Sequence, residues 1–572
     1  MNVLKKFIVP ALALGMLAAC SDDNKFDGPE NPEGDGNSVT MSISVQLPVA
    51  TGSRAASNVG NPATEAGSEA ECTVNRMIIV LADKDNGFID YADAVIDAQD
   101  NKNIKNIICN ASFSISTLTN YLQSLNNETS VRAFAFCNYS SDFAAYLSTL
   151  TKNGKTTDWI NQYASISGAV DVSGNWNNAI KADIPMANSE IFTATLPSAA
   201  DLPEHDVDNP IKLSTSTDPI KVERSIARFD FKDGSENEDF TYNIYDEEDT
   251  KINVVLDRIA LVNMSTKYYY LRHTAPDGTS DVVADLTKTT ILDGTHPWVI
   301  DVDAETKKDY TDGVSSEDFL FPVVSNNQPG RNLWYSTPVS DFAKAEAEED
   351  NAEWTGEAGY KVWRYVTENT IPVASKQKNG QSTGIVFKAK LAFEGTGALA
   401  TALNTAKANG DAIYFYKSEK VVPLGAAADV KKANKIYADA FNAAVKDDDP
   451  TSVESKKALT QAGFIIYEPA EGGSSSLGVN DTKGEYYMYY YYWNRHDDNN
   501  QVNVMAPMEF GVVRNHIYKL KVEEITGLGH PRKPENDPDP EEPGDDDEEG
   551  NVAIEIHVQT VDWSVRENGI KL

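Results

Sequence analysis

The sequence predicts an all-β protein with short helical insertions, and three observations support this prediction. Short segments of alternating or continuous apolar residues, bounded by turn residues, recur from Met77 to the C terminus. Helical periodicity is confined to a few short segments. The chain lacks the regular alternation of strands and helices that a parallel α/β sheet requires, which argues against a dinucleotide-binding enzyme.

Size and charge narrow the class of protein further. The chain has 572 residues, 41% of them hydrophobic, which suits two or three packed domains. Its 50 Lys and Arg residues against 87 Asp and Glu residues give a net charge of −37. A surface this acidic repels phosphate backbones and anionic lipid headgroups. The charge therefore argues against nucleic-acid binding and against membrane attachment through a basic patch.

Motifs of catalysis are missing from the sequence. There is no HExxH, GxSxG or CxxC pattern and no phosphate-binding glycine loop, and the seven His residues are scattered singly. We therefore expect no catalytic residue, no metal site, no cofactor and no enzymatic activity. Residues 83–87 partly resemble a calcium loop, but the glycine falls one place late and no Glu closes the loop. A hairpin turn at Asn86-Gly87 between strands at 77–81 and 88–91 is the simpler prediction.

The N terminus has the form of an export signal, so residues 1–20 are a predicted signal peptide. Lys5 and Lys6 precede an apolar stretch that is shorter than the roughly 20 residues of a membrane span. The stretch ends in Leu-Ala-Ala-Cys, which resembles a bacterial lipobox and predicts that Cys20 is lipidated; an ordinary signal peptide with a chance Cys is the alternative. The acidic run at 21–24 resembles the surface-export signal of Bacteroidota lipoproteins, or forms a solvated tether.

Residues 21–54 form a predicted propeptide, made of a Gly- and Pro-rich linker and one amphipathic strand. Over residues 39–49 every second residue is apolar, which is the period of a strand with one buried face. The apolar positions are Val39, Met41, Ile43, Val45, Leu47 and Val49. A strand with this pattern must belong to a sheet.

A protease site follows that strand directly. Residues 50–57 are small and flexible and carry a single Arg, so we expect a trypsin-like protease to cut between Arg54 and Ala55. The next Arg, Arg76, abuts the apolar run at 77–81, and we expect it to be protected. A protein cut at this place loses the strand in front of the cut after folding. An uncut tether between domains is the alternative.

Loop-rich sequence near residues 200–221 divides the rest into an N-terminal β-sandwich at 55–220 and a C-terminal β-sandwich at 221–530. Strand signals include residues 77–81, 131–136, 222–231, 252–256 and 518–522. Helical spacing appears at residues 118–125, 399–406 and 430–444, which places a helical insertion at about 395–460.

Two features of this body leave alternatives open. The odd number of thiols, Cys72, Cys109 and Cys137, predicts one disulfide and one buried free thiol, although the sequence does not choose the pair. The aromatic run at 485–493 is a possible platform for stacking sugars. Because alternate residues of a strand point to opposite faces, we favour a structural role with half of these aromatics in the core and half outside.

The chain ends in a second amphipathic segment on a tether. Residues 531–550 are acidic and Pro-rich, which keeps a linker extended. Residues 551–572 then alternate again, with a phase slip at Thr560 that predicts a bulge or a turn onto a second sheet. The apolar positions are Val552, Ile554, Ile556 and Val558 before the slip, and Val561, Trp563 and Val565 after it.

The C-terminal blocks resemble those of the Bacteroidota fimbrillins, especially the Mfa-like major fimbrial subunits. The matching blocks are residues 489–497, 508–510, 513–515, 518–520 and 561–568. Residues 222–228 resemble the segment that joins the two domains of that family, and residues 412–416 precede a helical insertion as they do there. Residues 55–220 are similar only in general layout.

The resemblance implies two transthyretin-like β-sandwich domains and a structural subunit of a cell-surface fimbrium, or type V pilus, that supports adhesion. It implies export as a lipoprotein held in the outer membrane by Cys20, an Arg-specific protease that cuts after Arg54, and head-to-tail polymerisation in which residues 551–572 are the donor strand. The implied partners are further copies of the chain, anchor and tip subunits, and receptors on host or bacterial surfaces. A tip or accessory subunit, and a surface glycan-binding β-sandwich lipoprotein, are the alternatives.

Overall fold

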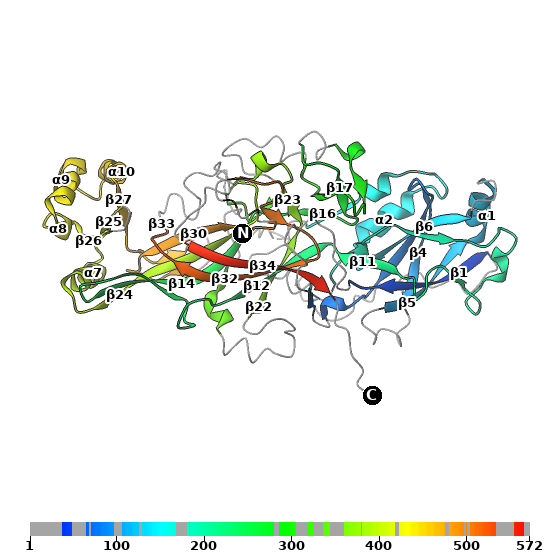
Figure 1. Ribbon diagram of the computed structural model, residues 1–572, viewed down its shortest axis with the longest axis horizontal. Coiled ribbons are helices and arrows are strands. Elements are labelled where there is room, and N and C mark those ends of the chain that lie inside the picture. Colours follow the sequence, from blue (N-terminus) through cyan, green and yellow to red (C-terminus); the bar gives the residue numbers. More distant parts are fainter. Residues whose placement is uncertain are drawn as a thin grey trace, which may run out of the picture.

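The computed structural model is an elongated, mostly β molecule (Figure 1). An N-terminal sheet lies at one end, a small helical lobe at the other, and two C-terminal sheets lie between them. The structure describes residues 37–48, 64–67, 70–96, 106–124, 129–166, 180–181, 183–279, 285–304, 319–323, 336–343, 360–378, 380–417, 422–474, 480–496, 499, 501, 504–532 and 554–564. Among these residues no helix is long and apolar enough to cross a membrane.

The N-terminal sheet closes on itself through its first strand. Its strands are β1 (Ser38–Gln46), β3 (Met77–Ala82), β4 (Phe88–Ile96), β5 (Asn106–Ser114), β6 (Ser130–Cys137), β8 (Met186–Asn188), β9 (Phe192–Thr195), β10 (Ile211–Lys212) and β11 (Ile220–Arg224). The order runs β1-β11-β8-β6-β3-β4-β5, and β5 pairs with β1 again. The sheet therefore wraps around a core that includes Met77, Ile79 and Leu81 of β3.

Two helices cover the N-terminal sheet because each carries a short apolar face. Helix α1 (Ile115–Ser124) buries Leu118, Tyr121 and Leu122 against the inner core. Helix α2 (Ser141–Thr149) is capped by the Ser140 side chain and buries Phe143 and Leu147 on the outer face of β3 and β6. The predicted hairpin is confirmed, since β3 and β4 pair antiparallel, but the turn between them is centred on Lys84 and Asp85, just before Asn86-Gly87.

The C-terminal domain is a β-sandwich of two sheets. One sheet has the order β2-β34-β32-β12-β22 and the other β13-β14-β24-β30-β33, and a single apolar core lies between them. The first comprises β2 (Thr64–Ala66), β12 (Ile226–Lys232), β22 (Lys361–Thr367), β32 (His516–Ile525) and β34 (Ile554–Ser564). The second comprises β13 (Thr241–Glu247), β14 (Thr250–Val262), β24 (Gly384–Gly395), β30 (Tyr487–Trp493) and β33 (His530–Pro531), with β21 (Ser336–Pro338) beside β14.

Smaller strands connect and cover these sheets. They are β7 (Tyr163–Ser165) with β16 (Lys267–Tyr269), β17 (His273–Ala275) with β18 (Thr290–Ile291) and β19 (Trp298–Ile300), β15 (Met264–Ser265) with β20 (Phe319–Leu320), β23 (Asn369–Thr370) with β31 (Gly511–Val512), and β28 (Gly473–Ser474) with β29 (Asn480–Asp481). Pairing of β7 with β16 joins the N-terminal part of the chain to the C-terminal part.

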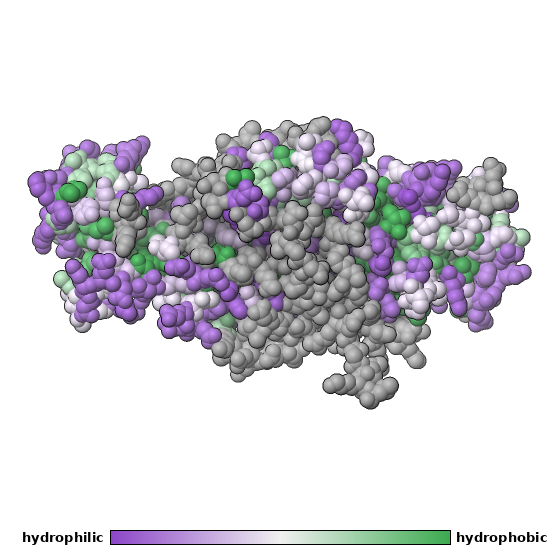
Figure 2. Space-filling view, viewed as in Figure 1, coloured by the Kyte–Doolittle hydropathy of each residue, from purple (hydrophilic) through white to green (hydrophobic). Residues whose placement is uncertain are grey.

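The helical lobe is inserted between β24 and β30. It consists of α7 (Ala398–Asn409), β25 (Ile413–Tyr416), β26 (Val422–Ala426), α8 (Ala427–Val430), α9 (Lys435–Ala444), α10 (Val453–Gln461) and β27 (Phe464–Tyr467). It has its own core around Tyr414, Phe441 and Leu459. In Figure 2 the described surface of both ends of the molecule is mostly hydrophilic, with apolar residues in small groups.

The structure corrects two predictions about strands. The aromatic strand β30 does not place half of its side chains outside, because both faces are covered: Tyr490 packs in the main core, while Tyr489 and Tyr491 pack in a second apolar layer with Phe510. The single strand expected at 222–231 is two strands in different sheets, β11 and β12, which meet at Ser225.

Two further predictions are wrong. No bulge interrupts β34 at Thr560, since its pairing with β32 is continuous from Ile556 to Asp562, and the irregularity lies on β32 between Val522 and Glu524. No disulfide forms among Cys72, Cys109 and Cys137, which are all buried free thiols. All three lie in the inner core of the N-terminal sheet, and the sulfur of Cys72 also lies 3.5 Å from the guanidinium of Arg224.

Candidate functional site

The first strand, β1, lies between neighbouring strands on both of its edges. We call the position that a strand occupies between its neighbours its seat. Nine residue pairs join β1 antiparallel to β5, from Ser38 opposite Ser114 to Gln46 opposite Asn106. Its other edge pairs in parallel with β10 at Met41 and with β11 at Val45. Because β1 is the strand that closes the sheet, its removal would leave both β5 and β10/β11 with unpaired backbone groups.

The apolar face of β1 is completely buried, as the sequence predicts. Val39, Met41, Ile43 and Val45 are 0% exposed and Leu47 is 1% exposed, all within the inner core. Five such side chains at about 1.5 to 3 kcal/mol each stabilise this seat by on the order of 10 kcal/mol. Val49 lies outside the described residues.

Polar contacts hold the opposite face of β1. The Thr40 and Ser112 hydroxyls lie 3.2 Å apart, and the backbone N–H of Thr40 donates to the His205 carbonyl at 3.3 Å. Ser214 accepts from the N–H of Ser44 at 2.8 Å and donates to its carbonyl at 2.9 Å. The Ser214 contacts and the Thr40–His205 contact are made with the backbone of β1, so they do not depend on the side chain at those positions.

The side chains that surround the buried face of β1 are apolar. Cys109 lies opposite Ile43 on β5 and is 1% exposed, and its thiol lies 3.6 Å from the sulfur of Met77. Burial raises the pKa of Cys109 to about 12. Removal of β1 would expose this thiol and its apolar neighbours to water.

The last strand, β34, has a more open seat on the other domain. It pairs antiparallel with β32, from Ile554 opposite Ile525 to Asp562 opposite His516. Ile556 is partly buried against the main core. In the part of the chain that the structure describes, β34's outer edge has one partner, β2, which reaches only its last three residues.

A buried acid anchors the chain just after β2. Glu71 lies in a short 3-10 helix (η1, Ala70–Cys72), and its two carboxylate oxygens accept from Arg228 Nη1 at 3.1 and 3.0 Å. The Tyr365 hydroxyl donates to Glu71 at 2.7 Å, and Arg228 also pairs with Asp230 at 2.8 Å. Both Glu71 and Arg228 are 1% exposed, and burial raises the pKa of Tyr365.

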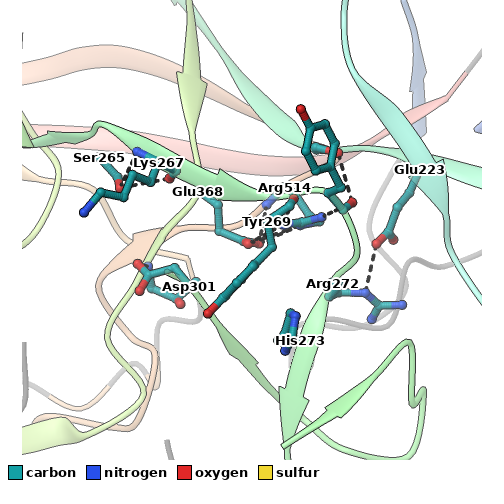
Figure 3. Close-up of polar contacts among 12 residues, drawn as sticks. Glu223, Ser265, Lys267, Tyr269, Arg272, His273, Asp301, Glu368 and Arg514 are labelled. Atoms are coloured by element: carbon teal, nitrogen blue, oxygen red, sulfur yellow. Dashed lines mark hydrogen bonds and ion pairs between the residues drawn. The ribbon is translucent and has the colours of Figure 1, made fainter. Parts of the chain in front are cut away.

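Further buried ion pairs fix the junction between the domains (Figure 3). Arg514 binds both carboxylate oxygens of Glu368 and donates to the carbonyl of Tyr269 at 2.9 Å. Arg272 donates to Glu223 at 3.0 Å, although burial still raises the pKa of Glu223. Pairs that are buried this completely are costly to break by removal of one partner.

Sequence reasoning did not identify the junction pairs or Glu71. The sequence feature that points to these ion pairs is the segment 222–228, where Glu223, Arg224 and Arg228 lie among apolar strand residues. Charged residues in a buried strand indicate partners elsewhere in the chain, but one sequence does not show which acids supply them.

The structure separates the predicted site residues into two seats. The described residues of the displaced strand lie together in the inner core of the N-terminal sheet, and they are Val39, Met41, Ile43, Val45 and Leu47. The described residues of the donor strand lie on β34 in the C-terminal sandwich, and they are Ile554, Ile556, Val558, Val561 and Trp563. Cys20, Arg54, Ala55, Val552 and Val565 lie outside the described residues. No group of three or more His, Cys, Asp or Glu residues suited to a metal ion occurs among the described residues.

Comparisons with known proteins bear on the C-terminal domain. Residues 484–569 match the family described as major fimbrial subunit protein type IV, fimbrillin, C-terminal, which confirms the fimbrillin resemblance over this segment. That description names a fimbrial subunit and not an enzyme. No curated protein sequence matches the chain.

Solved structures similar to this chain come from Bacteroidota relatives of low identity. A candidate cell adhesion protein from Parabacteroides distasonis is 14% identical, with 93% of this chain and 98% of that chain covered and a TM-score of 0.37. A fimbrillin (FimA) from Porphyromonas gingivalis is 13% identical, with 92% and 98% covered and a TM-score of 0.33. The tip fimbrial protein Mfa3 of that organism is 9% identical, with 92% and 100% covered and a TM-score of 0.34. TM-scores this low support no conclusion about this chain.

Proposed function

We propose that this chain, whose C-terminal region is that of a fimbrillin, is a structural subunit of a cell-surface fimbrium. The subunit is exported as a lipoprotein anchored through Cys20, is cut between Arg54 and Ala55, and polymerises by exchanging β1 for the tail of another copy. The observation that carries the proposal is that β1 is paired along both edges and closes one sheet, whereas β34 is the second strand of another sheet and its outer edge pairs with β2 at its last three residues.

Loss of β1 leaves a gap that must be refilled. The gap has an apolar floor and two rows of unpaired backbone groups, both of which are unfavourable in water. A strand from another copy restores the hydrogen bonds and inserts alternate side chains, and pilin donor-strand complementation is an established example of this mode. Apolar burial in this seat, worth on the order of 10 kcal/mol, can stabilise the incoming strand before the cost of association is subtracted.

The tail is suited to be that strand. At 11 residues β34 is longer than the 9 residues of β1, and it alternates apolar and polar residues over 554–558. It follows an acidic linker that starts after Arg532, and its detachment breaks the β32 and β2 pairings and the contact of Ile556 with the main core. A linker over residues 533–553 spans up to about 70 Å when extended.

Exchange between different surfaces of identical copies gives a filament. The acceptor seat lies in the N-terminal domain and the donor in the C-terminal domain, so the contact is head-to-tail and does not close into a dimer. While β1 remains in its seat the precursor stays monomeric. Proteolysis by an Arg-specific protease is therefore the switch, and anchor and tip subunits and surface receptors are the partners at the two ends of the fibre.

The competing function, a glycan-binding surface lipoprotein, loses its main support. Its sequence argument rests on the aromatic run at 485–493, and Tyr489, Tyr490 and Tyr491 are buried rather than displayed. Aromatic side chains buried in a core have no face left for a sugar.

Substitution of Arg54 tests the proposal. Both Arg54→Ala and Arg54→Lys remove the Arg-specific cut, so we expect lipidated monomers and no fibres in electron micrographs of the cell surface. Ser53→Ala leaves the cut site in place and is the control that should assemble normally. Fibres of normal length on Arg54→Ala cells would refute the assigned cut.

A further inference from the structure

Strand β2 connects the predicted cut to the tail. It begins at Thr64, nine residues after Ala55, and therefore stays on the mature subunit. It pairs in parallel with the end of the tail strand: Thr64 lies opposite Asp562, Glu65 opposite Trp563 and Ala66 opposite Ser564. Among the described residues that follow the predicted cut, the first strand pairing is thus with the donor segment.

Glu71 fixes β2 in that place from its C-terminal side. Only residues 67–70 separate the strand from Glu71, whose carboxylate is buried between Arg228 and Tyr365. Withdrawal of Glu71 would leave the buried Arg228 with one fewer acid, which is unfavourable. The backbone of β2 and the side chain of Glu71 are therefore held by the C-terminal sandwich, although the chain continues from them into β3 of the N-terminal domain.

Before the cut, β2 is also held from its N-terminal side. The chain that leads into it comes from β1, which is locked in its seat on both edges. When a segment leaves its partner it gains conformational freedom. The gain is smaller for a segment that is held at both ends than for one that is held at one end. A cut after Arg54 removes one of the two ties.

We propose that β2 is a clip that holds the tail on its own subunit, and that the cut loosens this clip. One proteolytic event then prepares both partners of the exchange, because it frees β1 to leave the acceptor seat and weakens the hold on the donor. The inference rests on the proposed function for the identity of the donor. The clip itself is a property of the folded precursor.

Hydrogen exchange of the tail in purified precursor tests the clip without any polymerisation. In an Arg54→Ala background, Glu65→Pro places a proline within the three-residue β2 and disturbs its pairing with β34. We expect exchange in a peptide covering residues 554–564 to become about threefold faster or more, with no change in the β5 peptide. Ser57→Pro puts the same residue upstream of β2 and is the matched control.

The second part of the experiment tests the effect of the cut. Wild-type precursor is treated briefly with an Arg-specific protease, and the tail peptide is compared before and after while β1 still occupies its seat. Faster exchange after the cut is expected, and equal exchange would overturn the link between cut and clip. Equal exchange in Glu65→Pro and its parent would overturn the clip itself. Neither result depends on fibres, so failure here is distinguishable from failure of the proposed function.

Discussion

The first and last strands of this protein share a sequence pattern but occupy different kinds of seat. The apolar face of β1 is at most 1% exposed over Val39–Leu47, and both edges of the strand are paired. The tail strand β34 has β32 on one edge and three residues of β2 on the other. Alternation therefore shows that a strand has a buried face, whereas the neighbours decide how firmly it is held.

The largest expected effect is in the seat of β1. Ile43→Asp places a carboxylate in a dry apolar core and should lower the free energy of unfolding of the precursor by about 5 kcal/mol or more. The matched change Ile556→Asp, at a partly buried position of β34, should cost much less. Denaturant unfolding of both variants measures the difference, and equal losses would mean that the two strands are held alike.

Loss of the acid that anchors β2 should be nearly as costly. Glu71 and Asp230 both form ion pairs with the buried Arg228. Glu71→Gln removes one of these two carboxylates, and we expect about 3 to 5 kcal/mol of destabilisation. Lys435→Gln removes the exposed pair with Asp439 and is the control, with an expected effect below about 0.5 kcal/mol. A small effect of Glu71→Gln would show that the segment after β2 is not anchored there.

Acid should weaken the C-terminal side more than the N-terminal domain. Burial lowers the pKa of His273 from 6.5 to about 4 and that of His496 well below its usual range, so the unfolded chain takes up protons first. The contribution of these His residues to the free energy of unfolding is then fully present above pH 6.5 and falls as the pH drops towards 4. The one His of the N-terminal domain, His205, is not buried.

For His273 alone the expected loss between pH 7 and pH 4.5 is about 2 to 3 kcal/mol. Gln can keep the hydrogen bond to the Ile160 carbonyl without taking up a proton, so His273→Gln should abolish that share of the loss. Thermal unfolding of wild type and variant at both pH values measures it. An unchanged pH dependence in the variant would show that other groups dominate.

The smallest expected effect is in the tail. Ile556→Ala removes apolar contact at a partly buried position and should cost about 1 kcal/mol, whereas Met41→Ala in β1 should cost about 2 to 5 kcal/mol. Denaturant midpoints of the two variants at equal m-values give the comparison. A tail variant as damaging as Met41→Ala would contradict an easily released donor.

Much of this architecture follows from local patterns in the sequence. The all-β plan, the hairpin of β3 and β4 and the helices α1, α7 and α9 follow from periodicity and turn residues. Helix α2 was not predicted, because only Phe143 and Leu147 mark its buried face. Helix α10 is mostly polar, and Leu459 is its one fully buried apolar residue, so it also gives no periodic signal.

What the sequence could not supply depends on contacts between distant segments. Alternation in β30 does not reveal that a second apolar layer covers Tyr489 and Tyr491. Glu71 and Arg228 are 157 residues apart, and nothing local links them. The seat of the tail on β32 and β2 is likewise a matter of long-range pairing, which periodicity does not specify.

Cross-linking of fibres made from an equal mixture of unlabelled and ¹⁵N-labelled subunits tests the exchange most directly. Mass spectrometry then shows whether peptides from the tail, residues 551–572, are linked to peptides from β5 and whether the two halves carry the same label. We predict tail-to-β5 links in which half of the pairs are mixed in label, from subunits that begin at Ala55. Tail links confined to β32 of the same copy, or subunits that still begin at Cys20, would contradict the account.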